Sequence, residues 1–125
     1  MYVIAPTWFL ISFAHKYCRK EWQLGPVNSN LAKGDNSVAF GKSNKTNGIS
    51  SFSSGEGTTA NGKYSTSMGY KTLSCGTSSI AIGYESRTNG PYALAQGYQS
   101  YANGIASIAM GYQAKACAPY SISLG

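Results

Sequence analysis

The stretch SIAIGYESRTNGPY, residues 79–92, holds two glycines seven positions apart, Gly83 and Gly90. The same spacing continues in both directions along the chain. Glycine stands at every seventh position from Gly34 to Gly111, Ala118 occupies the next of these positions, and Gly125 occupies the last. A period kept without gaps over most of a 125-residue chain is typical of repeat proteins. The sequence therefore predicts a fold built by stacking one small unit.

The repeating unit has fourteen residues, because alternate seven-residue halves differ. From residue 37 the units read SVAFGKSNKTNGIS, SFSSGEGTTANGKY, STSMGYKTLSCGTS, SIAIGYESRTNGPY, ALAQGYQSYANGIA and SIAMGYQAKACAPY, followed by a partial SISLG. A helix is disfavoured, since each glycine in a helix interior costs about 1 kcal/mol. The segments between the glycines are short, alternate in polarity and contain many β-branched and aromatic residues, which indicates strands.

Turn signals separate these expected strands. Asn-Gly dipeptides recur, and Pro91 and Pro119 each follow a glycine or its equivalent, where a turn needs no backbone N–H. Each unit is therefore predicted to be strand, turn, strand, turn. Stacked units give an all-β parallel solenoid that rises about 4.8 Å per coil. The expected turn glycines are Gly34, Gly41, Gly48, Gly55, Gly62, Gly69, Gly76, Gly83, Gly90, Gly97, Gly104, Gly111 and Gly125.

The direction of the side chains follows from the residue types in each column of the repeat, numbered from position 1 at Ser37. Positions 1, 3, 8 and 10 hold mostly small residues, whereas position 9 holds Lys45, Arg87 and Lys115. Because Lys and Arg must reach water, period-two alternation turns positions 8 and 10 inward. The similarity of the two halves predicts the same for positions 1 and 3, which gives a thin interior of Ser and Ala.

Positions 2 and 4 are then expected to face outward and to form an apolar stripe about 30 Å long. Side chains of this size each contribute about 1.5–3 kcal/mol when they are covered, which predicts an oligomer interface. In the alternative parity, positions 2 and 4 lie inside and the chain is a stable monomer. The expected interface residues are Val38, Phe40, Phe52, Met68, Ile80, Ile82, Leu94, Ile108, Met110, Ile122 and Leu124.

The motifs SVAFG, SIAIG, SIAMG and SISLG, with intervening ANG or TNG, resemble the YadA-like head repeats of trimeric autotransporter adhesins. The resemblance covers about residues 30–125. It implies a left-handed parallel β-roll that assembles as a homotrimer, with the first strand of each coil toward the three-fold axis. It also implies a non-enzymatic head at the cell surface or outer membrane that attaches to host or extracellular-matrix components or to other cells, a role associated with virulence.

Similar repeats occur in phage and viral fibre proteins, so a structural or receptor-binding segment of a virion fibre is the alternative function. The neck, coiled-coil stalk and membrane-anchoring barrel of a complete adhesin are not in the sequence, and the last unit is partial. We therefore expect the chain to be either a fragment of a longer protein or the product of an incompletely assigned gene.

Residues 1–29 form a separate N-terminal segment in which the apolar run MYVIAPTWFLISFA precedes the basic run HKYCRK. A secretory signal has its positive charge before the apolar run, and a membrane span would be longer and free of Pro6. The segment is left as a leader, a wrongly assigned start, or a cap over the first coil. The residues expected in such a cap are Trp8, Phe9, Leu10 and Trp22.

Catalytic and nucleic-acid functions are not favoured by the composition. Charged residues make up only 11% of the chain, and the net charge of +6 is spread thinly, which is more typical of solubility than of nucleic-acid binding. His15 has no recognisable triad partners, and the GKS at 41–43 lacks the glycine that a phosphate loop needs at Asn36. We expect no enzyme activity, no cofactor and no metal. Cys75 and Cys117 lie three coils apart, about 14 Å, and are predicted to be free thiols.

Two further surfaces are candidates for contact with a ligand. Tyr70, Tyr84, Tyr98 and Tyr112 recur after one glycine of each coil, and Tyr64, Tyr92 and Tyr120 end alternate coils. Stacked tyrosines stabilise a solenoid through ring contacts, and they also suit an interface. The second strand gives the other surface, and an ice-binding face is not favoured because position 3 has no threonine. The expected ligand-facing residues are Lys45, Arg87, Tyr101 and Lys115.

Overall fold

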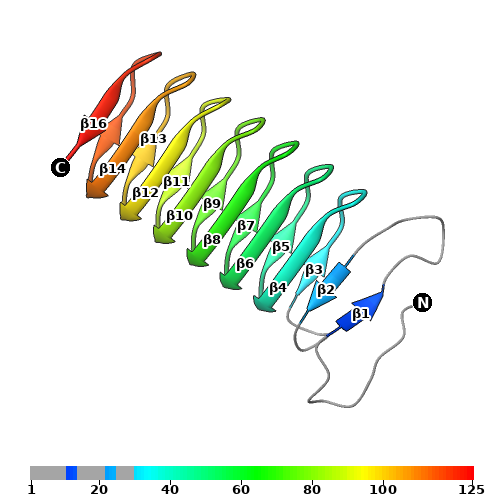
Figure 1. Ribbon diagram of the computed structural model, residues 1–125. Helices are drawn as coiled ribbons and strands as arrows, with labels where there is room; N and C mark the ends of the chain where they lie inside the picture. Colours follow the sequence, from blue (N-terminus) through cyan, green and yellow to red (C-terminus); the bar gives the residue numbers. More distant parts are fainter. Residues whose placement is uncertain (1–10, 14–21, 25–29) are drawn as a thin grey trace.

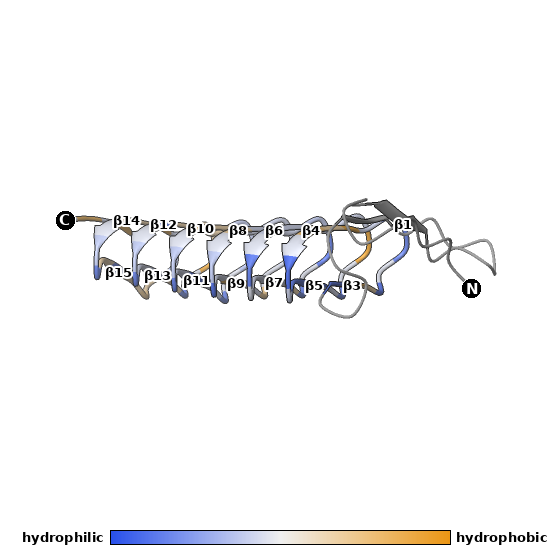
Figure 2. Cartoon of the chain, turned by 90° about the horizontal axis from the view of Figure 1, so that it is seen from below, coloured by the Kyte–Doolittle hydropathy of each residue, from blue (hydrophilic) through white to orange (hydrophobic). Residues whose placement is uncertain are grey.

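A computed structural model describes residues 30–125, together with the backbone of the strands β1 (Ile11–Phe13) and β2 (Trp22–Leu24). Residues 30–125 contain strands, turns and bends, and no helix. The chain winds into an elongated roll in which each coil lies against the next (Figure 1). Two sheets form the two layers of the roll along its whole length (Figure 2).

The first sheet contains the first strand of every coil. Its strands after β2 are β4 (Val38–Lys42), β6 (Phe52–Glu56), β8 (Thr66–Tyr70), β10 (Ile80–Tyr84), β12 (Leu94–Tyr98), β14 (Ile108–Tyr112) and β16 (Ile122–Leu124). The second sheet contains the two-residue strands β3 (Leu31–Ala32), β5 (Lys45–Thr46), β7 (Thr59–Ala60), β9 (Leu73–Ser74), β11 (Arg87–Thr88), β13 (Tyr101–Ala102) and β15 (Lys115–Ala116).

Neighbouring strands within both sheets of the roll are parallel and in register by one repeat. Ile80 of β10 lies opposite Leu94 of β12, and Arg87 of β11 lies opposite Tyr101 of β13. Both pairs are fourteen residues apart, so the predicted solenoid of fourteen-residue coils with two short strands per coil is confirmed.

The first sheet extends beyond the repeats at its N-terminal end. Strand β2 is parallel to β4, with Trp22 opposite Val38, and β1 is antiparallel to β2, with Ile11 opposite Leu24. β2 thus pairs with the edge strand of the first coil, and β1 pairs with β2 in turn. Trp8, Phe9 and Leu10, the other expected cap residues, lie outside the described residues.

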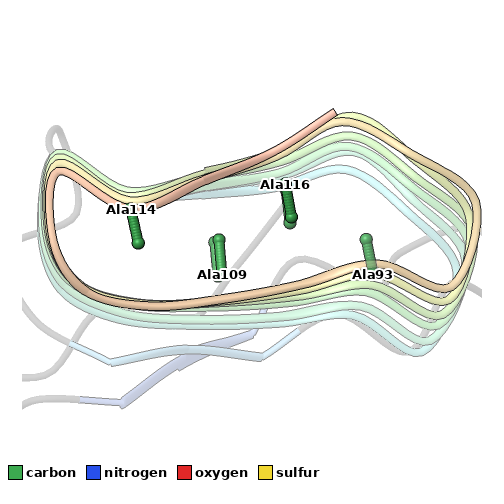
Figure 3. Packing of buried hydrophobic residues seen from close by; sticks show 6 residues of the cluster. Ala93, Ala109, Ala114 and Ala116 are labelled. Atoms are coloured by element: carbon green, nitrogen blue, oxygen red, sulfur yellow. The ribbon is translucent and has the colours of Figure 1, made fainter. Parts of the chain in front are cut away.

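The interior contains only small and medium-sized side chains. In Figure 3, Ala93 and Ala109 of one layer point toward Ala114 and Ala116 of the other across a narrow space. Positions 1, 3, 8 and 10 are buried in every complete coil, as predicted. The alternative parity, with positions 2 and 4 inside, is therefore wrong.

Much of this interior is polar, and hydrogen bonds between coils satisfy most of it. The Nδ2 of Asn44 donates to the carbonyls of Phe40 and Gly55, while its Oδ1 accepts from the backbone N–H and the hydroxyl of Thr58 at 2.9 and 2.7 Å. A serine at position 1 also stabilises the turn that precedes it, because the Ser79 hydroxyl donates a hydrogen bond to the carbonyl of Gly76 at 2.7 Å. A Ser-rich interior therefore stabilises the fold through hydrogen bonds where there is little apolar area to bury.

The structure divides the glycines into two sets and corrects their expected role. Gly48 and its equivalents come just before the turns, but they do not have positive φ. They are required because a Cβ on Gly48 would lie 2.0 Å from the carbonyl oxygen of Gly62 in the next coil. Positive φ in these turns falls on the residue two positions later, for example Ser50 at 51°.

The other set, Gly41 and its equivalents up to Gly111, lies inside the long strands and not in the turns, contrary to the prediction, while Gly125 directly follows β16. The glycines inside the strands have φ of 105–125° and also contact the next coil closely. Gly83 is one of them, and its added Cβ would lie 2.2 Å from the carbonyl oxygen of Gly97. The chain bends two residues after Gly83, at Glu85, where φ is 53°.

Candidate functional site

The outer face of the first sheet carries an apolar stripe, formed by positions 2 and 4. The eleven residues expected there all lie on this face: four are exposed and the other seven are half-buried. The exposed four are Met68, Ile80, Ile122 and Leu124. Phe40 and Phe52 pack edge to face with ring centroids 5.4 Å apart, so the stripe is ordered by contacts between coils.

Polar residues interrupt the stripe at only three places, Ser54, Thr66 and Gln96. Every coil therefore presents at least one large apolar side chain on the same face. Apolar surface repeated along an entire face is characteristic of a contact with another protein molecule. Burial of each such side chain against a partner would contribute about 1.5–3 kcal/mol.

The outer face of the second sheet carries the four residues expected to face a ligand. Lys45, Arg87 and Lys115 are exposed and Tyr101 is half-buried. Arg87, Tyr101 and Lys115 occupy adjacent coils, and the Lys115 Nζ lies 5.9 Å from the centroid of the Tyr101 ring. Lys45 is separated from these three by the coils that carry Thr59 and Leu73.

An asparagine ladder flanks this basic column at position 11. The Asn47 Nδ2 donates to the Asn61 Oδ1 at 2.6 Å, and the Asn89 Nδ2 donates to the Asn103 Oδ1 at 2.8 Å. The sequence interpretation treated these residues only as turn formers. Their recurrence at one position of the repeat was the signal for a ladder, since equivalent residues in stacked coils lie side by side.

The predicted tyrosine stack is confirmed at position 6. The ring centroids of Tyr70, Tyr84, Tyr98 and Tyr112 lie 4.9, 5.0 and 5.0 Å apart in sequence order, with interplanar angles of 18° or less. Desolvation raises the pKa of the Tyr84 phenol above its ordinary value, and the charge of Glu85 raises it further. The rings and their neighbours at position 7 form one edge of the roll, which we call the tyrosine edge.

The opposite edge of the roll, made by positions 13 and 14, exposes apolar residues that the sequence interpretation only partly identified. Tyr64, Tyr92 and Tyr120 were identified, and they are 56–78% exposed. Ile49 and Ile105 were missed, although they are 41% and 47% exposed. They occur in only two coils, so no column of like residues pointed to them. We call positions 13 and 14 the turn edge.

The described residues contain no cluster of three His, Cys, Asp or Glu side chains that could hold a metal ion. Cys75 and Cys117 are free thiols, as predicted, whereas Cys18 and His15 lie outside the described residues. No helix long and apolar enough to cross a membrane is found in the described part of the chain.

The family model described as YadA head domain repeat (2 copies) matches the sequence five times. The matched residues are 32–53, 47–72, 76–100, 89–114 and 102–125, which leave only residues 73–75 unmatched between 32 and 125. No curated protein matches the chain.

Proposed function

The chain belongs to the family of YadA head domain repeats, and from this premise we propose that it is the non-enzymatic head of a homotrimeric surface adhesin. In this function three copies associate along their first sheets. The second sheets then face the surroundings and attach to an extracellular protein or to a ligand on another cell. We place this head at the cell surface, on the outer membrane.

The observation that carries this proposal is the apolar stripe. Its side chains recur in every coil on the face that an isolated chain leaves in contact with water. Covering this face with two other copies removes it from water in every coil at once, which a globular partner could not do as uniformly. The hydrophobic effect supplies the driving force, and three-fold symmetry closes the assembly.

The second-sheet face supports the ligand-binding half of the proposal. When the first sheet faces the three-fold axis, the outer face of the second sheet is the broad surface left for a ligand. It carries Arg87, Tyr101 and Lys115 in consecutive coils, and both arginine and tyrosine are favoured at binding interfaces. These residues, with Lys45, are the proposed ligand-facing set.

The assembly is tested with Ile82→Asp, which places a charge on the stripe. Analytical ultracentrifugation is expected to show a trimer for the wild type and a monomer for the variant, with the far-ultraviolet circular dichroism of both unchanged. Thr59→Asp is the matched control, since it adds the same charge on the outer face of the second sheet and is expected to remain trimeric. A monomeric wild type would overturn the proposed assembly.

Attachment is tested on cultured cells and on a panel of purified extracellular-matrix proteins. The triple variant Lys45→Ala, Arg87→Ala, Lys115→Ala is expected to remain trimeric and to lose most attachment. The charge-conserving variant Lys45→Arg, Arg87→Lys, Lys115→Arg is expected to retain more of it. Attachment unchanged by the triple alanine variant would remove this face as the ligand site. A trimer with no attachment at all would favour a structural spacer, as in a virion fibre.

A further inference from the structure

Positions 6 and 13 of the repeat lie at opposite edges of the flattened coil. Position 6 ends the long strand, and position 13 lies in the turn that follows the second strand. Figure 3 shows the coil end-on as a flat loop with one bend at each end. We use height for the displacement along the long axis of the roll. Because the two positions are seven residues apart, they differ in height by half a coil, about 2.4 Å.

We propose that, in the trimer, the tyrosine edge of each copy packs against the turn edge of the next copy at the same height. This inference rests on the proposed trimer and specifies which surfaces meet in it. When three flat rolls face one axis, a cyclic arrangement brings the left edge of one roll to the right edge of its neighbour. Closed three-fold symmetry has no translation along the axis, so residues at similar heights meet.

The charges of the two edges are complementary at the N-terminal end of the roll. At the tyrosine edge, position 6 holds Lys42 and Glu56 in the first two coils, and these form an ion pair of 3.7 Å. At the turn edge, Asp35 lies half a coil below Lys42, and Lys63 lies half a coil above Glu56. Ile49 lies between Asp35 and Lys63 at the turn edge, and across the interface the four charged side chains would alternate in sign, in the order Asp35, Lys42, Glu56, Lys63.

Neither Asp35 nor Lys63 forms an ion pair with another described residue of its own chain. Both are exposed at the turn edge, as are Lys42 and Glu56 at the tyrosine edge. The intrachain pair therefore leaves room for each of its members to meet a second, opposite charge. An alternating row of four charges is more favourable than an isolated exposed pair, which contributes little.

The two facing columns, positions 6 and 13, carry no charge above Glu56 and Lys63, whereas position 7 of the tyrosine edge adds Lys71 and Glu85. Above Glu56, position 6 holds only tyrosine, from Tyr70 to Tyr112. Above Lys63, position 13 holds Thr77, Pro91, Ile105 and Pro119. In the proposed register the upper tyrosines meet proline and isoleucine, and no charge of either column meets a charge of the same sign.

The backbone of the turn edge also suits a contact surface. Tyr64, Tyr92 and Tyr120 adopt left-handed backbone conformations with φ of 57–59°, in which a bulky residue is unfavourable. The same position holds Asn36 or Ser50 in other coils, where the residue is small and polar. Three large aromatic side chains thus occupy this edge despite a local conformational cost, and the next copy would cover them.

A charge exchange tests the lower half of the register. The variant Lys42→Glu, Glu56→Lys keeps the intrachain ion pair but places like charges opposite Asp35 and Lys63 of the neighbouring copy. The variant Asp35→Lys, Lys63→Asp does the same from the other edge. At low ionic strength we expect each to weaken the trimer about tenfold, as measured by its dissociation constant, and the combined four-residue variant to recover the affinity. The differences should shrink at about 1 M salt, where the charges are screened.

Cysteine crosslinking tests the upper half. In a chain carrying Cys18→Ser, Cys75→Ser and Cys117→Ser, we add Tyr98→Cys and Ile105→Cys, which lie at opposite edges of one chain and half a coil apart. Under mild oxidation we expect covalent trimers on a denaturing gel. The control pair Tyr98→Cys with Thr59→Cys, on the outer face of the second sheet, should give none.

The outcomes separate this inference from the proposed function. A protein that remains trimeric, yet gives no crosslink and no response to the charge exchange, would overturn the edge contact and leave the trimeric head intact. A protein that sediments as a monomer would overturn both. Crosslinked trimers together with recovery in the four-residue charge variant would establish the edge contact and its register.

Discussion

The ring of Tyr84 lies almost parallel to the ring of Tyr98, with centroids 5.0 Å apart and an interplanar angle of 5°. The two residues are fourteen positions apart and pair in register between β10 and β12. The ring spacing matches the separation of adjacent strands, about 4.8 Å. The aromatic stack thus adopts the period of the backbone ladder without distorting it, and each ring contributes to the contact between two coils.

Removal of an inner ring should therefore cost more than removal of the last ring. Tyr98→Ala breaks two stacking contacts, to Tyr84 and Tyr112, whereas Tyr112→Ala breaks one among the described residues. Because an aromatic pair contributes about 0.5–1.5 kcal/mol beyond its buried area, we expect Tyr98→Ala to lower the free energy of unfolding by about 1–3 kcal/mol more than the loss of area alone. Urea unfolding of both variants measures the difference, and equal losses would contradict an energetic role for the stack.

Alkaline pH should loosen the stack through Tyr84. Desolvation raises the pKa of Tyr84 in the fold, so folding favours the neutral phenol. The resulting stabilisation is complete below the ordinary tyrosine pKa of about 10 and is lost as the pH rises through the higher pKa of the folded protein. Titration of tyrosinate absorbance should show at least one tyrosine that ionises later than the others.

Glu85→Gln removes a negative charge that raises the pKa of Tyr84, so the late ionisation should shift to lower pH in that variant. Glu56→Gln, which removes a more distant carboxylate of the same edge, is the control and should leave the late step in place. A late ionisation that is the same in all three proteins would show that Glu85 does not act on Tyr84.

Gly90→Ala should be far more damaging than Gly57→Ala. A Cβ on Gly90 would lie 2.0 Å from the backbone carbonyl oxygen of Gly104, and neither backbone can yield without breaking the ladder. A Cβ on Gly57 would meet the Cγ of the flexible Lys71 side chain at 3.3 Å, and the substitution mainly forces alanine into a left-handed φ of 69°. We expect a loss of about 1–2 kcal/mol for Gly57→Ala and a clearly larger loss, or failure to fold, for Gly90→Ala.

Asn44→Ala should destabilise the roll, whereas Asn47→Ala should be nearly neutral. The buried Asn44 side chain bonds to the carbonyls of Phe40 and Gly55 and accepts from Thr58, so its removal leaves buried partners unpaired. The exposed Asn47 has water available in place of Asn61. Expected losses are about 2–4 kcal/mol for Asn44→Ala and less than about 1 kcal/mol for Asn47→Ala. Thermal unfolding followed by circular dichroism compares them, and similar midpoints would contradict a structural role for the interior amide.

The architecture and the side-chain parity were predictable from the sequence because a repeat samples each position several times. Lys45 alone would not show which way its column faces. Lys45, Arg87 and Lys115 in one column require that column to face water. Small residues on either side of it then have to be inside. This argument uses only alternation along a strand, and the structure confirms it.

The reason for the glycines was not predictable in the same way. The sequence interpretation attributed Gly48 to the turn propensity of the Asn47-Gly48 pair. In the structure the glycine is needed because any side chain at this residue would collide with the carbonyl oxygen of Gly62. That contact joins residues fourteen positions apart and depends on how closely the coils stack. Likewise, Ile49 and Ile105 gave no periodic signal, and only the structure shows them exposed at one edge.

The alternation of serine and alanine in the buried columns has a consequence for how such a chain can change its length. Ala81 and Ser67 occupy equivalent buried places in adjacent coils and are in register, so either residue fits the space that the coil provides. A fourteen-residue duplication or deletion in the gene would therefore join compatible coils and alter only the reach of the rod. Recombination between repeats would change the length of the rod in steps of one strand spacing, about 4.8 Å, and each added coil would present the same surfaces.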